Sequence, residues 1–452
     1  MLQAEYRGGN RLFPSGVGST AEMRRLLFVG GSPEPGGLQI HTADVMQAIT
    51  ALGHGVAMVS GERDYFAKIT PRDRIPFERV RHLSVGRFIR RPLVNGLARA
   101  FALIFVLARY KGHDVVLCRG RFAETPCLDM LLAKIFGRTI YAIEHAPWVE
   151  DWPFLMSKTR YGAVMGRCVR RVITVSAEIA ETAAREFQIP ADKLSVCRNW
   201  VDPGFRPATD DSKRLARQRQ GLPQDALIFG YLGRLSPEKR VDVLIEAFRQ
   251  HLASRQASNS VLVIAGEGSS RAGLEEQARL AGIGAQIRFF GWQTDPRDVF
   301  DLLDLFVLPS MVEGFPLALM EAMSSGLACL AHPMSSTREL IDSGLNGILC
   351  DLSTARSLAG ELAALHDADR SGVSAMGRAA AEKIEQGFSR RIRLRAVLEA
   401  LDIPVDVTQV PPPYNRAMEY QFGKVISAAN ASSPSPEGMV GDAGIEPATP
   451  PV

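Results

Sequence analysis

Several features that would assign the chain to a specialised class are missing from its 452 residues. Its six cysteines lie far apart, with no C-x-x-C pair and no cluster with histidine, so neither a disulfide framework nor a structural zinc site is expected. Scattered thiols of this kind are typical of a reducing compartment. The closest candidate for a membrane span, Leu97–Leu107, is shorter than the roughly 18 apolar residues required and contains Arg99. We expect a buried core helix there.

The first 22 residues lack the apolar segment of a secretory signal peptide. They are polar and glycine-rich, and we expect residues 1–22 to be disordered or to precede a true start at Met23. Residues 402–452 are predicted to form a disordered tail, because Pro, Ser, Gly and Ala leave little apolar surface to pack. Whether residues 1–22 and 441–452 belong to the native protein is a question that the sequence leaves open.

Two motifs that would indicate a bound cofactor or metal are also absent. The glycines at Gly36-Gly37 and in Gly266-Glu267-Gly268 do not extend into G-x-G-x-x-G, so there is no dinucleotide fingerprint. The D-x-D sequence Asp367-Ala368-Asp369 lies at a predicted helix end and not in a loop after a strand. We therefore predict no cofactor and no obligatory metal.

Charge is distributed unevenly, although the whole chain carries a net charge of only +4. Residues 24–200 contain 26 Lys and Arg against 16 Asp and Glu, whereas residues 201–401 contain 23 against 25. The first half should therefore attract anionic partners such as lipid headgroups or phosphorylated substrates. No nucleic-acid partner is expected, because the cations do not form runs interleaved with aromatic residues.

Short apolar runs alternate with helical patterns along both halves of the chain, which is typical of a doubly wound α/β fold. The first series begins at Leu26–Val29 and the second at Ala226–Leu232. We predict an N-terminal Rossmann-like domain at 23–203, a C-terminal one at 204–387 and a crossover helix at 388–401. Ligands of such sheets bind outside the carboxyl ends of the strands, so the site is expected in a cleft where the two domains face each other.

The strongest functional signal is the segment from Glu313 to Glu321, EGFPLALME, which follows a predicted strand and opens a helix. Pro316 suits the first helical turn, where its missing N–H is no loss. Free N–H groups around Phe315–Ala318 can bind a diphosphate, with a carboxylate on each side to accept hydrogen bonds from sugar and ribose hydroxyls. The alternative is an amphipathic helix that carries two solvated glutamates.

A second signal is the loop GRLSPEKR at residues 233–240, directly after another predicted strand. Arg234 and Lys239 can converge on a diphosphate, the first as a planar fork and the second as a point charge. The pair Gly36-Gly37 would let the backbone of the first domain approach a phosphate closely. Taken singly, these features are equally compatible with two surface cations and an ordinary turn.

Together these segments make residues 24–401 resemble the family-4 retaining glycosyltransferases, which have the GT-B fold. In that family the last helix crosses back onto the first domain. The matching segments are Gly36-Gly37, Thr174–Ser176, Asn199–Asp202 with Phe205 and Pro207, the loop 233–239, Gly266-Glu267-Gly268, the E-x7-E pair Glu313 and Glu321, and Phe388-Ser389 before a basic helix to Leu401.

The resemblance implies a role for each matched residue. Arg234 and Lys239 would neutralise the donor diphosphate, and the Gly37 backbone would approach the phosphates from the first domain. Glu321 would hold the ribose hydroxyls, while Glu313 would contact the transferred sugar. The catalytic and donor-binding positions implied in this way are Gly36, Gly37, His145, Arg234, Lys239, Gly266, Glu267, Glu313, Gly314, Phe315, Pro316, Leu317 and Glu321.

Three positions call for comment. His145 matches a family position whose imidazole or backbone touches the donor sugar, but a single histidine after a strand can equally be structural. Family members usually have glycine where this chain has Arg240, which bears on the geometry of the loop. They also usually have a glycine before the glutamate that corresponds to Glu339, which bears on the sugar pocket and hence on donor identity.

The resemblance implies a retaining hexosyltransferase that moves a sugar from a nucleotide-diphosphate-sugar donor to a glycan, lipid-linked or small-molecule acceptor in bacterial polysaccharide or glycolipid synthesis. The alternatives are another GT-B sugar-nucleotide enzyme, such as an epimerase or hydrolase, and an inactive sugar-nucleotide-binding protein. The expected location is the cytoplasm. The apolar and basic stretch Arg87–Lys111 suggests peripheral contact with an anionic membrane at the inner face of the cell membrane, or else a core helix flanked by solvated arginines.

Overall fold

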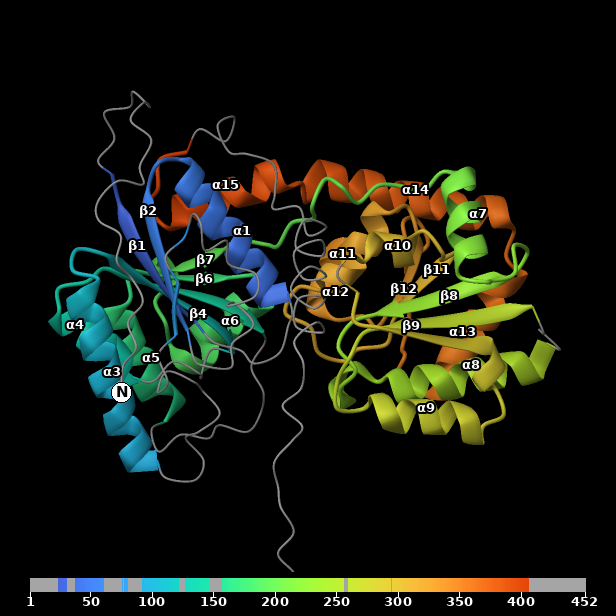
Figure 1. Ribbon diagram of the computed structural model, residues 1–452, viewed down its shortest axis with the longest axis horizontal. Helices are drawn as coiled ribbons and strands as arrows, with labels where there is room; N and C mark the ends of the chain where they lie inside the picture. The colour runs from blue at the N-terminus through green and yellow to red at the C-terminus, as the bar shows by residue number, and fades with distance from the viewer. Residues whose placement is uncertain are drawn as a thin grey trace, which may run out of the picture. The chain divides into compact units, whose positions relative to one another are not determined.

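A computed structural model of the protein describes most of residues 23–405 (Figure 1). The described ranges are 23–30, 37–60, 75, 77–79, 92–121, 127–146, 157–255, 259–293 and 295–405. Of residues 77–79, 92–98 and 119–121 only the backbone is described. The disorder expected for residues 1–22 and for the tail beyond 405 lies outside these ranges, and so does Gly36.

The first domain is built on a sheet of seven parallel strands. Their bounds are β1 (Arg25–Gly30), β2 (Gly55–Ser60), β3 (Phe77–Arg79), β4 (Asp114–Arg121), β5 (Ile140–Ala146), β6 (Arg171–Thr174) and β7 (Leu194–Val196). The order across the sheet is β3-β2-β1-β4-β5-β6-β7, with Phe28 of β1 opposite Met58 on one side and Val116 on the other. These strands are almost entirely apolar because helices cover both faces of the sheet.

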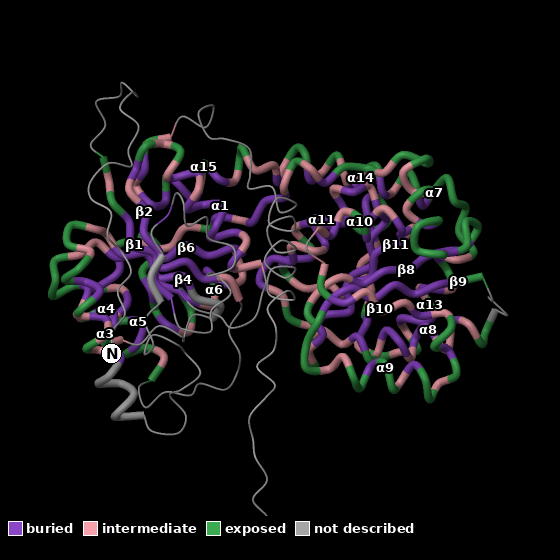
Figure 2. Tube along the Cα trace, viewed as in Figure 1, coloured by how far each residue is buried: buried purple, intermediate pink, exposed green. Residues whose placement is uncertain are grey.

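Two helical layers enclose this sheet (Figure 1). One layer consists of α1 (Gly37–Ala51) and α15 (Arg390–Ala400), and the other of α3 (Pro92–Arg109), α4 (Cys127–Ile135), α5 (Lys158–Cys168) and α6 (Ala177–Phe187), with the short turn η4 (Ala191–Lys193) before β7. Each layer has its own core: Val45 and Ile49 of α1 pack with Leu398 of α15, whereas Val106 of α3 packs with Met165 of α5. Figure 2 shows this burial along the strands and the inner helix faces.

The second domain repeats the arrangement around six parallel strands. These are β8 (Leu227–Leu232), β9 (Ser260–Ala265), β10 (Ile287–Gly291), β11 (Leu305–Leu308), β12 (Ala328–Ala331) and β13 (Ile348–Leu349), in the order β10-β9-β8-β11-β12-β13. The helices and short turns are α7 (Asp210–Arg219), η5 (Pro237–Lys239), α8 (Val241–Arg255), α9 (Arg271–Leu280), η6 (Gly284–Gln286), α10 (Arg297–Phe300), α11 (Leu317–Ser324), α12 (Ser335–Leu340), α13 (Ala355–Asp367) and α14 (Arg370–Gly387). Two Rossmann-like α/β domains in succession are the GT-B fold that the sequence predicts.

The sequence predicts strands at 26–29, 56–60, 114–118, 138–144 and 172–176 in the first domain and at 226–232, 260–265, 286–290, 305–308 and 328–331 in the second. All are confirmed to within a few residues, but three short strands were not predicted. These are β3, β7 and β13, which have only two or three residues each and lie at or next to a sheet edge. So few residues carry too little periodicity to be recognised. No helix in the part of the chain that the structure describes is long and apolar enough to span a bilayer.

The prediction of a buried core helix at Leu97–Leu107 is wrong for one side of that helix. In α3, Leu103, Val106 and Leu107 are buried, but Phe101 is 70% and Phe105 is 56% exposed. The helix lies on the surface of the first domain and buries only one face, as an amphipathic helix does.

The last two helices join the domains. In α14, Ala380 and Ile384 pack into the core of the second domain, while α15 packs Leu394 and Val397 into the first. The chain therefore crosses back, as the resemblance implies. The Arg24 guanidinium also donates hydrogen bonds to the carbonyl oxygens of Leu401 and Asp402, at 2.6 and 2.9 Å, directly after α15.

One buried carboxylate fixes the start of α15 on the first domain. The Arg390 guanidinium donates two hydrogen bonds of 2.7 Å to Asp44 of α1, and the Trp200 indole Nε1 donates a third of 2.8 Å. The side chains of Asp44 and Arg390 are each only 10% exposed. A paired, hydrogen-bonded carboxylate in such a place is costly to remove because its partner would stay charged and buried.

We predict that Asp44→Ala lowers the free energy of unfolding by about 3 kcal/mol, since it removes the buried carboxylate that accepts two hydrogen bonds from the Arg390 guanidinium and one from the Trp200 indole. Denaturant titration followed by circular dichroism measures the change. The control is Asp342→Ala, which removes the 2.6 Å ion pair of a 57% exposed carboxylate with Lys383 and should cost less than about 1 kcal/mol. Equal losses in the two variants would contradict the anchoring role of Asp44.

Candidate functional site

Segments from both domains meet beside the E-x7-E motif. Gly314, in the loop between β11 and α11, lies so close to the end of β5 that a Cβ atom on it would be 1.9 Å from the carbonyl oxygen of His145. Only glycine fits such an approach of one backbone to another. The motif glycine is thus explained by a contact between the domains that sequence spacing could not show.

Two helix starts lie together at the same place. A Cβ atom on Gly37, the first residue of α1, would be 2.8 Å from Cδ1 of Leu317, the first residue of α11. The first N–H groups of each helix have no partner within the helix and carry its positive dipole end. The structure therefore brings together two helix starts, one from each domain, of the kind that can bind an anion.

The helix of the E-x7-E motif begins one residue later than predicted. Pro316 is in an extended conformation and caps α11 instead of lying in its first turn, and Leu317 is the first helical residue. Glu321 lies within the helix and is 5% exposed. The Phe315 side chain is buried against Phe388, and its carbonyl oxygen accepts a 3.1 Å hydrogen bond from the Asn199 amide. Phe315 can therefore offer only its backbone N–H to a ligand.

The structure pairs two residues to which the resemblance gives separate roles. The Lys239 ammonium lies 2.6 Å from Oε1 of Glu313, and the two side chains are 15% and 13% exposed. Loops that follow β8 and β11, adjacent strands of the second sheet, bring them together. A largely buried lysine beside a carboxylate gives the site one cation and one hydrogen-bond acceptor at a fixed separation.

Arg234 is more exposed than Lys239, the other cation predicted to bind the diphosphate. Its guanidinium is 44% exposed and lies 3.5 Å from the Glu238 carboxylate, four residues on. The Tyr231 hydroxyl donates a 2.9 Å hydrogen bond to the Arg234 carbonyl oxygen and so ties the loop to β8. Burial, with a smaller contribution from Glu313, holds the pKa of Tyr231 well above its usual value, so this hydroxyl remains a donor.

The two glycines after β9, Gly266 and Gly268, pack directly against the backbone of the loop 233–240. A Cβ atom on Gly266 would lie 1.8 Å from the Gly233 carbonyl oxygen, and one on Gly268 would lie 2.2 Å from that of Leu235. The Leu235 N–H donates a 2.8 Å hydrogen bond to the Glu267 carbonyl oxygen, while the Glu267 carboxylate pairs with Arg271. Gly266 and Glu267 thus brace the cationic loop, and direct contact with a donor stays a prediction for them.

The unusual Arg240 adopts the backbone conformation that favours glycine. Its φ and ψ are 54° and 36°, in the left-handed region, and this accounts for glycine at the corresponding family position. The arginine keeps that conformation while its guanidinium donates a 2.8 Å hydrogen bond to the Ser353 carbonyl oxygen. At the second difference from the family, where the glycine before Glu339 is missing, Glu339 of α12 forms an ion pair with Arg198.

The structure adds a second histidine that was not predicted. His41 of α1 is 4% exposed, and its ring centroid lies 4.9 Å from that of His145 and 4.2 Å from that of Trp200. Both ring nitrogens of His41 and Nε2 of His145 are buried without a hydrogen-bond partner among the residues that the structure describes. The available signal was the position of His41, one helical turn after Gly37.

Burial makes both imidazoles neutral. It lowers the pKa of His41 to about 3 and holds that of His145 well below 6.5, where His41 contributes further. A neutral imidazole has one N–H donor and one acceptor nitrogen. The unpaired atoms therefore point to a polar ligand group that completes them. Within the described ranges, no group of three or more His, Cys, Asp or Glu residues could hold a metal ion.

Comparisons with known proteins identify similar sequences along both domains. The family model described as Glycosyltransferase Family 4 matches residues 35–205, and the one described as Glycosyl transferases group 1 matches residues 212–383. A D-inositol 3-phosphate glycosyltransferase of Streptomyces avermitilis is 34% identical over 388 residues, which cover 78% of this chain and 80% of that protein.

A second relative, the UDP-Gal:alpha-D-GlcNAc-diphosphoundecaprenol alpha-1,3-galactosyltransferase of Escherichia coli, is 29% identical over 63% of this chain and 74% of its own length. Among solved structures, Anabaena HepE in complex with UDP-glucose aligns with a TM-score of 0.69 and 19% identity, covering 84% of this chain and 99% of that one. A glycosyltransferase from Rickettsia africae aligns with a TM-score of 0.69, 18% identity and coverage of 84% and 98%. At these identities the structures show a shared fold.

We predict that Gly314→Ala weakens binding of a nucleoside diphosphate at least about tenfold, because its Cβ must push the His145 carbonyl away by more than 1 Å. Isothermal titration calorimetry with UDP, GDP and ADP measures this. The matched control is Gly360→Ala in α13, where an added Cβ meets nothing within 4 Å and helix propensity favours alanine. Unchanged affinity in Gly314→Ala would show that the close approach is not needed for the site.

Buried neutral histidines should also make stability depend on pH. Between pH 6.5 and about 3 the unfolded chain binds a proton at His41 that the folded chain does not, so stability falls as the pH is lowered. We expect the free energy of unfolding of His41→Asn to fall less steeply than that of the wild type, by about 1.4 kcal/mol per pH unit below pH 6.5. Denaturant titrations at pH 7.5, 6.5 and 5.5 test this, and parallel curves would contradict it.

Proposed function

The chain belongs to the family-4 glycosyltransferases, which have the GT-B fold, and from this premise we propose that it transfers a hexosyl group with retention from a nucleotide-diphosphate-sugar donor. One observation carries the proposal: Glu313, which pairs with Lys239, lies in the loop that leads into α11, and Leu317 at the start of α11 lies against Gly37 at the start of α1. A doubly charged diphosphate beside a sugar is the kind of ligand that such a set of groups suits.

The charges support a diphosphate leaving group. Breaking the bond between the anomeric carbon and the diphosphate oxygen builds negative charge on the leaving group and positive charge on the sugar. Lys239, Arg234 and the N–H groups at Leu317 would stabilise the first charge, and such preorganised stabilisation is usually the largest catalytic term. We propose that these protein groups suffice and that no obligatory metal takes part.

Glu313 would accept hydrogen bonds from hydroxyls of the transferred sugar, and Glu321 from those of the ribose. His145 would contact the sugar near the reacting carbon, through its neutral imidazole or its backbone. In the proposed reaction the acceptor oxygen bonds to the anomeric carbon on the face that the diphosphate leaves. The acceptor proton passes to the departing phosphate oxygen, so atoms and charges balance without a protein nucleophile.

The donor and acceptor are proposed from chemistry and from relatives. The name of the Escherichia coli relative gives a UDP-sugar donor and an acceptor linked to diphosphoundecaprenol, and Anabaena HepE is solved with UDP-glucose. We propose a nucleotide-sugar donor for this chain too, and a glycan or lipid-linked acceptor bound by the first domain. Work at the cytoplasmic face of the membrane would follow from a lipid-linked acceptor and would suit the excess of cations in residues 24–200.

We predict that Lys239→Ala lowers sugar transfer at least about a hundredfold while the fold is retained, because the diphosphate loses its closest cation. The donor is identified first by the rise in melting temperature with UDP-, GDP- and ADP-sugars, since a ligand of the folded state alone stabilises it. Transfer to lipid-linked and free glycan acceptors is then followed by mass spectrometry. Lys383→Ala, which removes a partly exposed lysine that pairs with Asp342, serves as the matched control.

Full transfer activity in Lys239→Ala would refute the proposed role of the ammonium. The wild-type chain also separates the alternatives. Donor binding without any turnover would indicate an inactive binding protein, and release of free sugar without transfer would indicate a hydrolase.

A further inference from the structure

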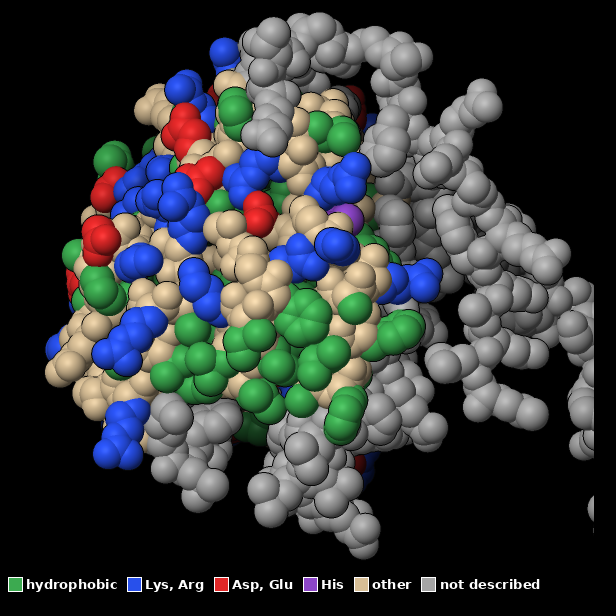
Figure 3. Space-filling view, turned by 90° about the vertical axis from the view of Figure 1, so that its left-hand side faces the viewer, with side chains coloured by type: hydrophobic (Ala, Val, Ile, Leu, Met, Phe, Trp, Pro, Cys, Tyr) green, Lys and Arg blue, Asp and Glu red, His purple; other side chains and the backbone are tan. Residues whose placement is uncertain are grey.

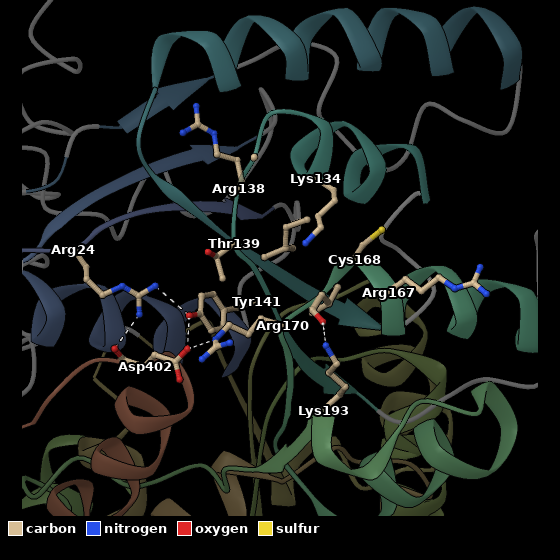
Figure 4. Close-up of a pocket in the computed structure, with 13 residues that line it drawn as sticks. Arg24, Lys134, Arg138, Thr139, Tyr141, Arg167, Cys168, Arg170, Lys193 and Asp402 are labelled. Carbon is tan, nitrogen blue, oxygen red and sulfur yellow. Dashed lines mark hydrogen bonds and ion pairs between the residues drawn. The ribbon is translucent and has the colours of Figure 1, made fainter.

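A charged cavity lies at the amino ends of the strands of the first sheet. It encloses about 590 Å³ and is lined by the chain just before and at the start of β5, by the chain between α5 and β6, and by the end of α15 (Figure 4). Ile140 begins β5 here, directly after Thr139, whereas His145 lies near the other end of the same strand. A strand of this length spans roughly 20 Å, so the cavity is separate from the candidate donor site.

Cations dominate the lining. Six of the thirteen lining residues carry positive charge and one carries negative charge. The cations are Arg24, Lys134, Arg138, Arg167, Arg170 and Lys193, and the carboxylate is Asp402. Because like charges gathered in a concave surface reinforce one another's potential, such a cavity attracts anions.

The single carboxylate is already occupied by partners. It forms an ion pair with Arg170 and accepts a 2.9 Å hydrogen bond from the Tyr141 hydroxyl, which also accepts one of 3.1 Å from Arg24 (Figure 4). These contacts neutralise Arg170, and Arg24 forms an ion pair with Asp114 outside the lining. Lys134, Arg138, Arg167 and Lys193 have no carboxylate partner within the described part of the chain. The positive excess of the cavity is therefore not cancelled by its own acidic residue.

Four of the lining cations keep N–H donors without a partner within the described part of the chain. Lys134 and Arg167 have no hydrogen-bond or ion-pair partner within the described part of the chain, and in Figure 4 Lys134 points in among the lining residues while Arg167 points away. Arg138 donates a 2.9 Å hydrogen bond to the Leu107 carbonyl oxygen through Nη2, but its Nε is buried and unpartnered. Lys193 donates to the Val169 carbonyl oxygen, at 3.2 Å. A phosphate group offers the several acceptor oxygens that such donors lack.

An exposed apolar face adjoins this cavity. It consists of Leu128, Leu131, Ile135 and Phe136 on and after α4, which are 36–77% exposed, together with Phe101 and Phe105 of α3. Figure 3 shows hydrophobic side chains gathered on this side of the molecule with Lys and Arg side chains beside them. Ile135 and Phe136 lie in the chain between Lys134 and Gly137, which both line the cavity, so this end of the apolar face borders it.

A buried ion pair fixes the outward direction of these apolar residues. Arg99 of α3 donates through Nε to both carboxylate oxygens of Asp129 of α4, at 3.1 and 3.0 Å, and both side chains are 2% exposed. The pair holds the two helices at one relative rotation. Phe101, Phe105 and Ile135 consequently remain exposed to solvent. Large exposed apolar patches usually mark an interaction surface.

We propose that the cavity binds the phosphate group of an anionic membrane lipid while the apolar face of α3 and α4 enters the headgroup region of the bilayer. This inference deepens the proposed function and rests on it for the need to reach a membrane. A free phosphate would account for the cations but would leave the adjoining apolar face uncovered. A lipid satisfies both, since it carries a phosphate and an acyl region in one molecule.

The test is co-sedimentation of the full chain with vesicles of phosphatidylcholine alone and of phosphatidylcholine with one third phosphatidylglycerol. We expect binding to the anionic vesicles only. The double substitution Lys134→Glu and Arg167→Glu should weaken it at least about tenfold, because each cation near an anionic surface contributes about 1 kcal/mol. Phe105→Ser with Ile135→Ser should weaken the binding that persists at high salt, where charge is screened.

The matched control is Arg356→Glu with Arg378→Glu, which changes the charge equally at exposed positions of the second domain. An equal loss in this control, or none in Lys134→Glu with Arg167→Glu, would overturn the proposal. Phosphatidylglycerol vesicles left unbound while inorganic phosphate stabilises the chain would also overturn it, in favour of a soluble anion. The melting temperature with UDP-sugars is measured in parallel: absence of a shift there counts against the proposed function and leaves the vesicle result standing.

Discussion

The site depends on how closely the backbones of the two domains approach each other at Gly314. The His145 carbonyl lies where any side chain at position 314 would have to be, and Leu317 lies against Gly37 in the same way. Because both contacts involve the residues that start or precede a helix, the approach also brings two positive helix ends together. Groups that belong to separate sheets can then act on one small anion. The cationic loop 233–240 completes the set, because Gly266 and Gly268 let a neighbouring loop pack directly beneath it.

A second constraint keeps the chain crossing in place. Asp44 binds Arg390 from the crossover helix and Trp200 from the segment after β7, and Trp200 in turn packs on His41. Successive turns of the helix that begins at Gly37 therefore carry the free N–H groups of its first residues, the buried imidazole of His41, and the Asp44 carboxylate that anchors α15. Such an arrangement couples the attachment of the crossover helix to the geometry near His145. Burial disfavours the charged form of both imidazoles and so keeps them neutral there.

The first domain uses the two ends of its sheet differently. At the carboxyl ends of the strands it contributes Gly37, His41 and His145 to the proposed donor site. At the amino ends it has the cation-lined cavity, with the exposed side of α3 and α4 next to it. Six of the 26 Lys and Arg residues in positions 24–200 line this one cavity. A domain organised in this way can hold two anionic groups, one at each end, without competition between them.

The sequence by itself determined the two-domain α/β architecture, the positions of nearly all long strands and the E-x7-E and Arg-Lys loops, because apolar periodicity and turn residues are local properties of the chain. It also marked Arg240 as unusual, although only the left-handed backbone there explains why. The pairing of Lys239 with Glu313, the neighbourhood of His41 and His145, and the exposed side of α3 were decided by the tertiary structure alone. These features join residues up to about a hundred positions apart or depend on helix rotation, and neither quantity is encoded in local spacing.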